Sequence, residues 1–423
     1  MGNKFLLAFK IPEVRNKILI VTGLLAVTRL FAAIPVPGID IGRLSGFLQS
    51  NQLLGFLDVF SGGGLSNFSL VMLGVGPYIT STIILQLLTM IFPKLKEIYY
   101  EQGEAGRAKF NRLSHYLTIP LAALQGYGFL NLLISQNVLG QMLPFDFARN
   151  VILITTGSMI LVWIGDLITE QKIGNGVSLI IFAGIVTQLP KTIQGAIATY
   201  DPSMLPTYIA FLVLAVVVIA GVVYINEGER KVPISYSKRI RGNKMYGGSS
   251  SYLPLKVNQA GVIPIIFAIS LLLFPQFIAQ ISAVFSADLS SKLNDLVNSI
   301  IGNQFIYSAL YFFLVVVFTY FYTAVTFDPK EISKNLQRSG GFVPGIRPGD
   351  PTGEFLGKII NRTTLFGALF LGIIAVLPNI TQMITGIQLL TIGGTALLIV
   401  VSVAIETMNQ IDSQLVLREY EGF

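Results

Sequence analysis

The chain has 423 residues, of which 52% are hydrophobic and only 12% are charged. Soluble domains carry about a quarter charged residues, so this composition leaves too little polar surface to cover a soluble globule. The net charge of +7 is less informative than its distribution over loops, and the absence of cysteine excludes disulfides and thiolate chemistry.

Long apolar stretches occupy most of the sequence, and a membrane helix needs about 20 such residues. The first stretch follows basic residues, as in a signal peptide, but it is too long for one, so we expect a retained helix. The last charge-free stretch, residues 363–405, is long enough for two crossings, and Pro378, Asn379 and Gly386 predict a turn between them. The ten predicted spans are residues 18–34, 70–92, 113–133, 151–168, 177–196, 208–225, 261–281, 307–327, 363–377 and 389–404.

An irregular segment, residues 52–69, separates the first two spans. Its apolar part is too short to cross a membrane, and Ser61 followed by three glycines interrupts it. Such a segment suits either a re-entrant piece buried in protein at membrane depth or an ordinary external loop. The residues alone leave both alternatives open.

Lys and Arg residues are concentrated in alternate loops. If the N-terminus is cytoplasmic, 24 of the 29 lie on that side, so the positive-inside rule places both termini in the cytoplasm. Two basic cytoplasmic loops, residues 226–256 and 328–358, are long enough to form docking surfaces, although they could instead only anchor topology and touch anionic lipid. Five spans on each side of Asp201 indicate an N-terminal half, residues 1–200, and a C-terminal half, residues 201–423, in an inverted repeat.

Four motifs in fixed order closely resemble the SecY/Sec61α family. They read SLVMLGVGPYITSTIILQLL at residues 69–88, IGNGVS at 173–178, KVNQAGVIP at 256–264 and GGFVPGIRPG at 340–349. The resemblance covers the whole chain and is bacterial in character. The chain departs from the family pattern at Asn67, Lys172 and Gly341, where arginine, glycine and alanine are usual. The family arginine at the position of Asn67 is thought to influence the orientation of signal sequences.

The resemblance implies an all-α polytopic membrane protein with two pseudo-symmetric halves of five helices. A secretory polypeptide would pass between the halves, and helices of membrane proteins would leave sideways through a lateral gate lined by the second and seventh spans. Residues 52–69 would then be the plug that blocks the closed pore. The plug residues are Phe56, Leu57, Val59, Phe60, Ser61, Gly62, Gly63, Gly64 and Leu65.

Matching the motifs position by position assigns an apolar ring at the waist of the pore. A narrow apolar constriction stops ions, yet it lacks hydrogen-bonding groups that would hold a passing chain. Without the motifs, these side chains would be ordinary lipid-facing or core aliphatics. The ring residues are Val75, Ile79, Val177, Ile181, Ile266 and Ile399.

Three polar residues lie at positions of the second and seventh spans where apolar ones are expected: Thr80, Gln86 and Asn258. Hydrogen bonds between membrane helices contribute about 0.6 kcal/mol each, which suits a lateral gate that must open. A static interhelical bond or a contact with water is the alternative. Arg29, Asp166 and Glu406 are interpreted as snorkelling or structurally paired groups.

The sequence predicts no enzyme, cofactor or metal site. The stretch from Gly353 to Lys358 is one residue short of a phosphate loop, and Ile359 stands where Ser or Thr would bind magnesium. His115, the sole histidine, has no second histidine or clustered carboxylate nearby. A secondary transporter also fits ten helices and an inverted repeat, but it usually places ionisable groups near the midplane, where this sequence offers an apolar waist.

Energy for transport must therefore come from partners. The resemblance implies the SecA ATPase or a translating ribosome on the cytoplasmic side, SecE and SecG as small membrane subunits, and SecDF and YidC as accessory proteins in the bacterial plasma membrane. Arg347 lies between prolines and glycines that favour a fixed, exposed turn, although it could instead pair with Asp350. The predicted docking residues are Arg230, Lys231, Lys238, Arg239, Arg241 and Arg347.

Overall fold

A helix occupies each of the ten predicted spans in the computed structural model of the chain. The structure describes residues 9–36, 58, 61–100, 102–135, 138–140, 142–198, 202, 205–236, 239–241, 244–246, 250–282, 287–385 and 389–421. The ten helices are α2 (Pro12–Ala33), α5 (Gly76–Ile91), α7 (Gly103–Ser135), α8 (Pro144–Glu170), α9 (Gly176–Ala198), α10 (Leu205–Glu227), α11 (Ile263–Ser282), α13 (Gln304–Thr326), α15 (Asp350–Thr385) and α16 (Leu389–Glu421).

Eight of the described helices are long and apolar enough to cross a membrane on their own. Helix α5 passes the same test only together with α6 (Pro93–Tyr100), and the chain bends by 116° between the two. Pro93 explains the bend, because it forces Phe92 into an extended conformation and cannot donate a helical hydrogen bond. The apolar stretch of α11, Ile263–Gln276, is shorter. The protein is therefore a multi-pass membrane protein, and the count of ten crossings stays a prediction.

Helix α15 corrects the predicted turn between the last two spans. Pro378 and Asn379 lie inside this helix, which continues to Thr385, and Gly386 lies outside the described residues. A membrane helix tolerates proline when neighbouring groups satisfy the backbone around it. Pro378 removes the helical bond to the carbonyl of Ile374. The helix then continues with two side-chain bonds to its backbone: the Thr381 hydroxyl donates to the carbonyl of Leu377, and the Gln304 side chain donates to the carbonyl of Asn379.

The helices pack as two sets that follow chain order. Helices α2, α5, α7, α8 and α9 contact one another, and so do α10, α11, α13, α15 and α16. The sets meet along two seams: α11 contacts α5 and α7, and α16 contacts α9 and α2. The predicted division into two pseudo-symmetric halves, residues 1–200 and 201–423, stays a prediction.

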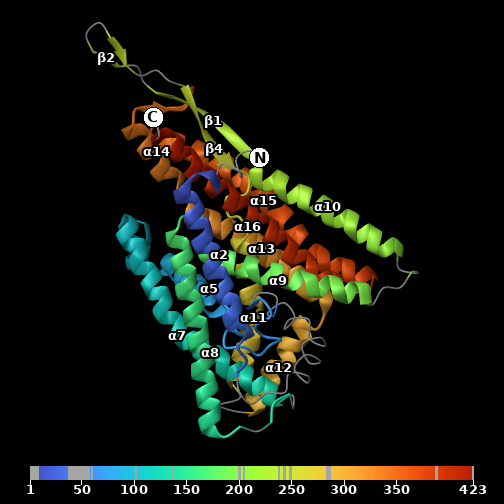
Figure 1. The fold of residues 1–423 in the computed structure, drawn as a ribbon. Coiled ribbons are helices and arrows are strands. Elements are labelled where there is room, and N and C mark those ends of the chain that lie inside the picture. The colour runs from blue at the N-terminus through green and yellow to red at the C-terminus, as the bar shows by residue number, and fades with distance from the viewer. Residues whose placement is uncertain are drawn as a thin grey trace.

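The two basic loops fold into one small sheet at one end of the bundle. Strand β1 (Glu229–Tyr236) pairs antiparallel with β4 (Ser250–Lys256) on one side and with β5 (Gly341–Phe342) on the other. The loop between β1 and β4 carries β2 (Arg239–Arg241) and β3 (Lys244–Tyr246), which reach farthest from the helices (Figure 1). Helix α14 (Pro329–Arg338) precedes β5.

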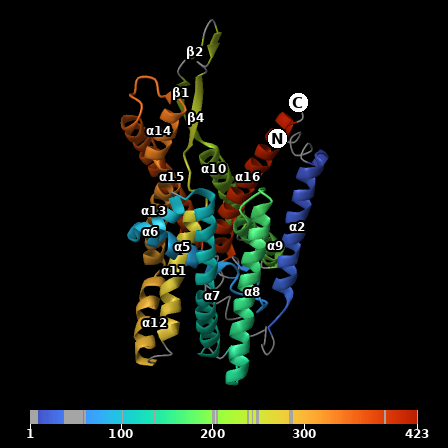
Figure 2. The same ribbon diagram turned by 90° about the vertical axis from the view of Figure 1, so that its left-hand side faces the viewer.

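The ends of the chain lie near this sheet. Figure 2 shows the start of α2 and the end of α16 at the end of the bundle from which the strands project. Helix α12 (Ala287–Ile301), which the sequence did not predict, lies at the opposite end. The basic loops and both chain ends thus share one end of the bundle, and their cytoplasmic orientation stays a prediction.

Candidate functional site

The ring residues lie on four helices of the two seams. Val75 directly precedes α5 and Ile79 lies near its start, Val177 and Ile181 lie at the start of α9, Ile266 on α11 and Ile399 on α16. All except Val177 are buried, and Val177 packs against the hydrophobic cluster to which the other five belong. The cluster contains many other aliphatic side chains, so membership alone does not define a ring. The assignment of these six residues stays a prediction.

The IGNGVS motif has a clear structural role at the start of α9. The Asn175 side chain accepts a hydrogen bond from the backbone of Ser178 at 3.1 Å, which caps the helix, and the backbone of Gly176 donates to the Thr169 hydroxyl at 2.9 Å. A Cβ on Gly176 would overlap the carbonyl of Gly165 on α8. Glycine at this position therefore allows α8 and α9 to approach closely and fixes where the following ring residue lies.

The three predicted gate residues lie on or beside α5 and α11, which contact each other. Thr80 donates to the carbonyl of Gly76 in its own helix at 3.0 Å. Gln86 is buried, and its Oε1 has no hydrogen-bond partner among the described residues. Asn258 donates from Nδ2 to Oδ1 of Asn226 on α10 at 2.8 Å. Within the described part of the chain, none of these hydrogen bonds crosses from α5 to α11, and the gate role stays a prediction.

Asn258 belongs to a polar network that sequence reasoning missed. Its Nδ2 also donates to the carbonyl of Gly261 at 3.1 Å, and Asn226 donates in turn to the Ser402 hydroxyl on α16 at 3.0 Å. The network thereby joins α10, α16 and the segment before α11. In the sequence, only Asn226 at the end of an apolar span indicated a polar site here, and its position does not show which residues it bonds.

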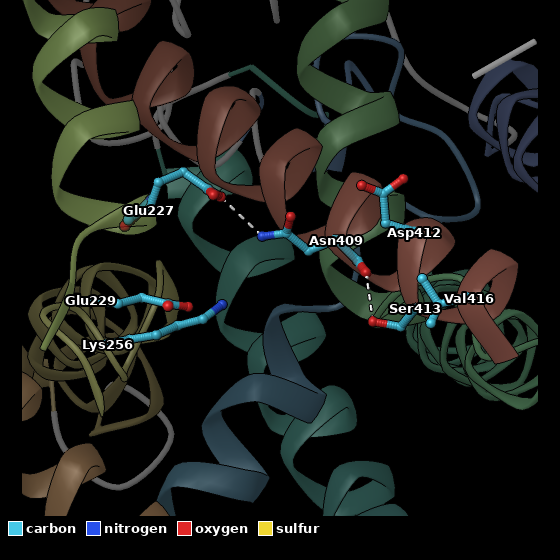
Figure 3. Close-up of a pocket in the computed structure, with 8 residues that line it drawn as sticks. Glu227, Glu229, Lys256, Asn409, Asp412, Ser413 and Val416 are labelled. Carbon is cyan, nitrogen blue, oxygen red and sulfur yellow. Dashed lines mark hydrogen bonds between the residues drawn. The ribbon is translucent and has the colours of Figure 1, made fainter. Parts of the chain in front are cut away.

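A pocket of about 640 Å³ lies beside this network, where β1 and β4 meet α10 and α16 (Figure 3). Asn409 donates to the Glu227 carboxylate at 3.0 Å, and the Ser413 hydroxyl donates to the carbonyl of Asn409 at 2.8 Å. The lining residues are Asn226, Glu227, Glu229, Lys256, Asn409, Asp412, Ser413 and Val416. A second pocket, of about 380 Å³, adjoins it and extends to Tyr322 and Glu406.

The predicted plug segment is described only in part. Phe56, Leu57, Val59 and Phe60 lie outside the described residues, whereas Ser61, Gly62, Gly63, Gly64 and Leu65 are described and buried. Asp58 organises the turn: its carbonyl accepts from the backbone of Gly63 at 2.8 Å, and its Oδ1 accepts from the backbone of Ser66 at 2.7 Å. The described residues are thus inside the protein, as the re-entrant alternative predicts, and their blocking of a pore stays a prediction.

Helices α2 and α9 hold this segment through residues that the sequence analysis did not assign to it. Arg29 on α2 donates from Nη1 to the carbonyl of Gly62 at 2.8 Å. Gln188 on α9 donates from Nε2 to the carbonyl of Asp58 at 3.0 Å and to its Oδ2 at 3.3 Å. A charge inside the first span was the one signal that could have pointed to Arg29.

The docking residues lie on the sheet and its turns. Arg230 and Lys231 are exposed on β1, Arg239 and Arg241 belong to β2, and Lys238 lies outside the described residues. Arg347 is exposed, and it forms no ion pair with Asp350 or any other described residue. Hydrogen bonds hold its turn: the Thr352 hydroxyl donates to the carbonyl of Arg347 at 2.9 Å, and the backbone of Ile346 donates to the carbonyl of Val343 at 3.0 Å. Gly345 and Gly349 adopt φ values of +82° and +99°, which glycine accommodates without a steric cost.

Two further ionisable residues lie close to each other on neighbouring helices. His115 on α7 approaches Asp166 on α8, with 3.3 Å between Nε2 and Oδ2. Within the described ranges, no three His, Cys, Asp or Glu side chains gather as metal ligands.

Comparison with known proteins decides the family. A family model described as SecY matches residues 69–408. The chain belongs to the SecY family. A Protein translocase subunit SecY from Thermus thermophilus is 42% identical over 100% of this chain and 98% of that protein, and one from Corynebacterium glutamicum is 41% identical over 98% of both chains. The resemblance predicted from the four motifs is thereby confirmed.

Solved structures show the same fold. One described as "The structure of a protein conducting channel" has a TM-score of 0.63 and 21% identity, covering 93% of this chain and 91% of that one. Sec61 from a canine ribosome–channel complex has a TM-score of 0.61 and 19% identity, again covering 93% of this chain and 91% of that one. The predicted polytopic α-helical fold is thereby confirmed.

Proposed function

We propose that this chain forms the channel of a protein translocase, through which unfolded secretory polypeptides cross a membrane. One observation carries the proposal: the six ring residues lie on or directly before α5, α9, α11 and α16, and these four helices contact one another across the two helix sets, α5 with α11 and α9 with α16. Opening the seams would therefore open the apolar waist. Relatives named protein translocase subunits match the chain over its full length, which supports the same function.

The same geometry supports lateral release of membrane-protein helices. The three residues that we assign to the gate, Thr80, Gln86 and Asn258, lie on or beside α5 and α11, and among the described residues they make no hydrogen bond that joins these two helices. Separating these helices would break apolar contacts, which a hydrophobic substrate segment replaces as it enters. Signal sequences and hydrophobic segments of substrates are the ligands of this seam.

Partners supply the energy and complete the complex. The sheet that joins the two basic loops presents exposed Arg230, Lys231 and Arg347, which suit acidic protein surfaces and RNA phosphates. We assign this surface to the SecA ATPase and the ribosome, and the membrane complex to SecE, SecG, SecDF and YidC. The chain itself acts without enzymatic activity, in the bacterial plasma membrane, with both termini cytoplasmic.

Reconstitution tests the proposed function. The chain is inserted into lipid vesicles with its small membrane subunits, the motor ATPase, ATP and a secretory precursor, and precursor protected from external protease is measured. The proposal predicts ATP-dependent protection that vesicles without the chain lack. Equal protection in both vesicle preparations would contradict it, and uptake of a small solute or ion instead would favour the transporter alternative.

A further inference from the structure

The described part of the plug segment is held by one helix set only. Leu65 and Phe68 pack in a buried cluster with Phe129 and Leu130 of α7 and with Ile154 of α8. Its hydrogen bonds to other elements come from α2, from α9 and from the residues that follow α2, as in the bond from the backbone of Val36 to the carbonyl of Phe68. Among the described residues, α10–α16 contribute neither a hydrogen bond nor a member of this cluster.

Arg29, Gly62 and Gly184 form a close contact between the segment and the helices. A Cβ on Gly62 would overlap the Arg29 guanidinium and would lie 2.7 Å from the Cα of Gly184 on α9. Gly62 also adopts a φ of +68°, which side chains disfavour. The backbones of the segment and of α9 therefore touch, and the guanidinium lies beside that contact.

The Arg29 guanidinium has few partners. Its Nη1 donates to the carbonyl of Gly62, and its Nε is buried without a hydrogen-bond partner among the described residues. A cation within a membrane helix is costly unless polar groups surround it. The segment supplies such a group through a peptide carbonyl, so it compensates this charge only while it stays in place.

Gln188 provides the second attachment. Its amide donates to the carbonyl of Asp58, which also accepts from the backbone of Gly63, and to Oδ2 of the Asp58 carboxylate, whose other oxygen, Oδ1, accepts from the backbone of Ser66. Asp58 thus ties the fold of the turn to α9. Moving the segment away from α9 would break these bonds together.

We propose that Arg29 and Gln188 are positioning residues that latch the plug segment to the N-terminal half, so that opening requires release from α2 and α9 rather than separation of the two halves alone. The inference rests on the proposed channel function and names the contacts that keep the channel closed. The segment travels with the N-terminal half when the seams part, and it leaves the pore only after the latch opens.

Resting conductance in planar bilayers tests the latch in the absence of precursor. Hydrogen bonds to charged groups contribute enough that their loss changes an equilibrium roughly tenfold to a hundredfold. We expect Arg29→Gln and Gln188→Ala each to raise the open probability roughly tenfold, and Arg29→Lys to raise it less, because lysine retains the charge. Arg149→Gln, which removes an arginine from a surface pair with Asp146, is the matched control.

A cross-linking experiment tests the latch without relying on the resting conductance or on the folding of the substituted variants. The chain has no cysteine, so Asp58→Cys with Gln188→Cys can be bridged by a short bismaleimide. Bridging should abolish precursor uptake into vesicles, whereas bridging Asp146→Cys with Arg149→Cys on one turn of α8 should not. Uptake by the wild-type chain in parallel tests the proposed function separately. Undiminished uptake after complete bridging, or wild-type resting conductance of both Arg29→Gln and Gln188→Ala, would overturn the latch.

Discussion

Ser235 in β1 pairs with Phe342 in β5, and this pairing joins two loops that lie about a hundred residues apart in the chain. A small core of Val232, Leu255 and Val343 lies beneath the joined loops. The two predicted docking loops are therefore one structural unit. The turn that carries Arg347 follows directly after β5 in this unit.

The first prediction concerns Arg347. We expect Arg347→Glu to leave the protein folded and inserted but to abolish ATP-driven precursor uptake, because the exposed turn then repels an acidic partner surface. Arg347→Lys should retain only part of the activity, since lysine cannot make a bidentate contact. Lys292→Glu on α12, at the opposite end of the bundle, is the control and should behave as wild type. Wild-type uptake by Arg347→Glu would show that the motor docks elsewhere.

The second prediction concerns the apolar waist. Ile266→Asn and Ile399→Asn place an amide in a buried, apolar cluster, which costs free energy in the closed state and admits water. A loss of about 1.4 kcal/mol raises the open fraction roughly tenfold. Bilayer conductance should rise, and precursors with defective signal sequences should be exported better. Ile373→Asn, at an exposed position of α15, is the control. An equal rise in conductance for this variant would contradict the assignment of Ile266 and Ile399 to the seal.

The third prediction concerns orientation. Single cysteines at Arg239 and Arg347 should react with an impermeant thiol reagent only from the cytoplasmic side, and one at Asp288 only from the outside. The chain has no cysteine of its own, so any labelling reports the introduced residue. Labelling of position 239 from outside intact cells would contradict the predicted cytoplasmic location of this loop.

The fourth prediction concerns the contact between α8 and α9. Gly176→Ala would drive a Cβ into the carbonyl of Gly165, and such overpacking costs about 1–3 kcal/mol. Gly23→Ala on α2 meets no atom within 4 Å and is the control. Trp163 on α8 is the only tryptophan, so its fluorescence reports unfolding in detergent. Equal unfolding midpoints for the two variants would contradict the close contact.

The spans were predictable because apolar length is a local property of the sequence. The sheet was not predictable, because β1 pairs with β5, and α11, α12 and α13 lie between the two strands in the sequence. The turn predicted at Pro378 is wrong, because proline usually ends a helix in water but is tolerated inside a membrane helix whose neighbours satisfy the backbone. Local sequence patterns thus predicted the helices but not the sheet that connects the loops at their ends.

The candidate site was predictable only where a motif carried it. The glycines at 62–64 indicated a break, but their contact with Arg29 and Gly184 depends on residues that are distant in the chain. Gln188 and Asp58 are 130 positions apart, so neither suggested the other. Asn258 was identified as a polar residue at a helix start, and only the structure shows that it bonds Asn226 rather than α5.

Cross-linking a polypeptide arrested in transit tests the central claim most directly. Single cysteines at Ile266 and Ile399 carry a photoreactive probe, and a precursor with a folded C-terminal domain is stalled in reconstituted vesicles. The account predicts cross-links from both positions, dependent on ATP and a signal sequence, and none from Ile373 on the exposed surface of α15. Cross-links from Ile373 alone, or from neither ring position while the precursor is stalled, would show that the polypeptide does not pass through this waist.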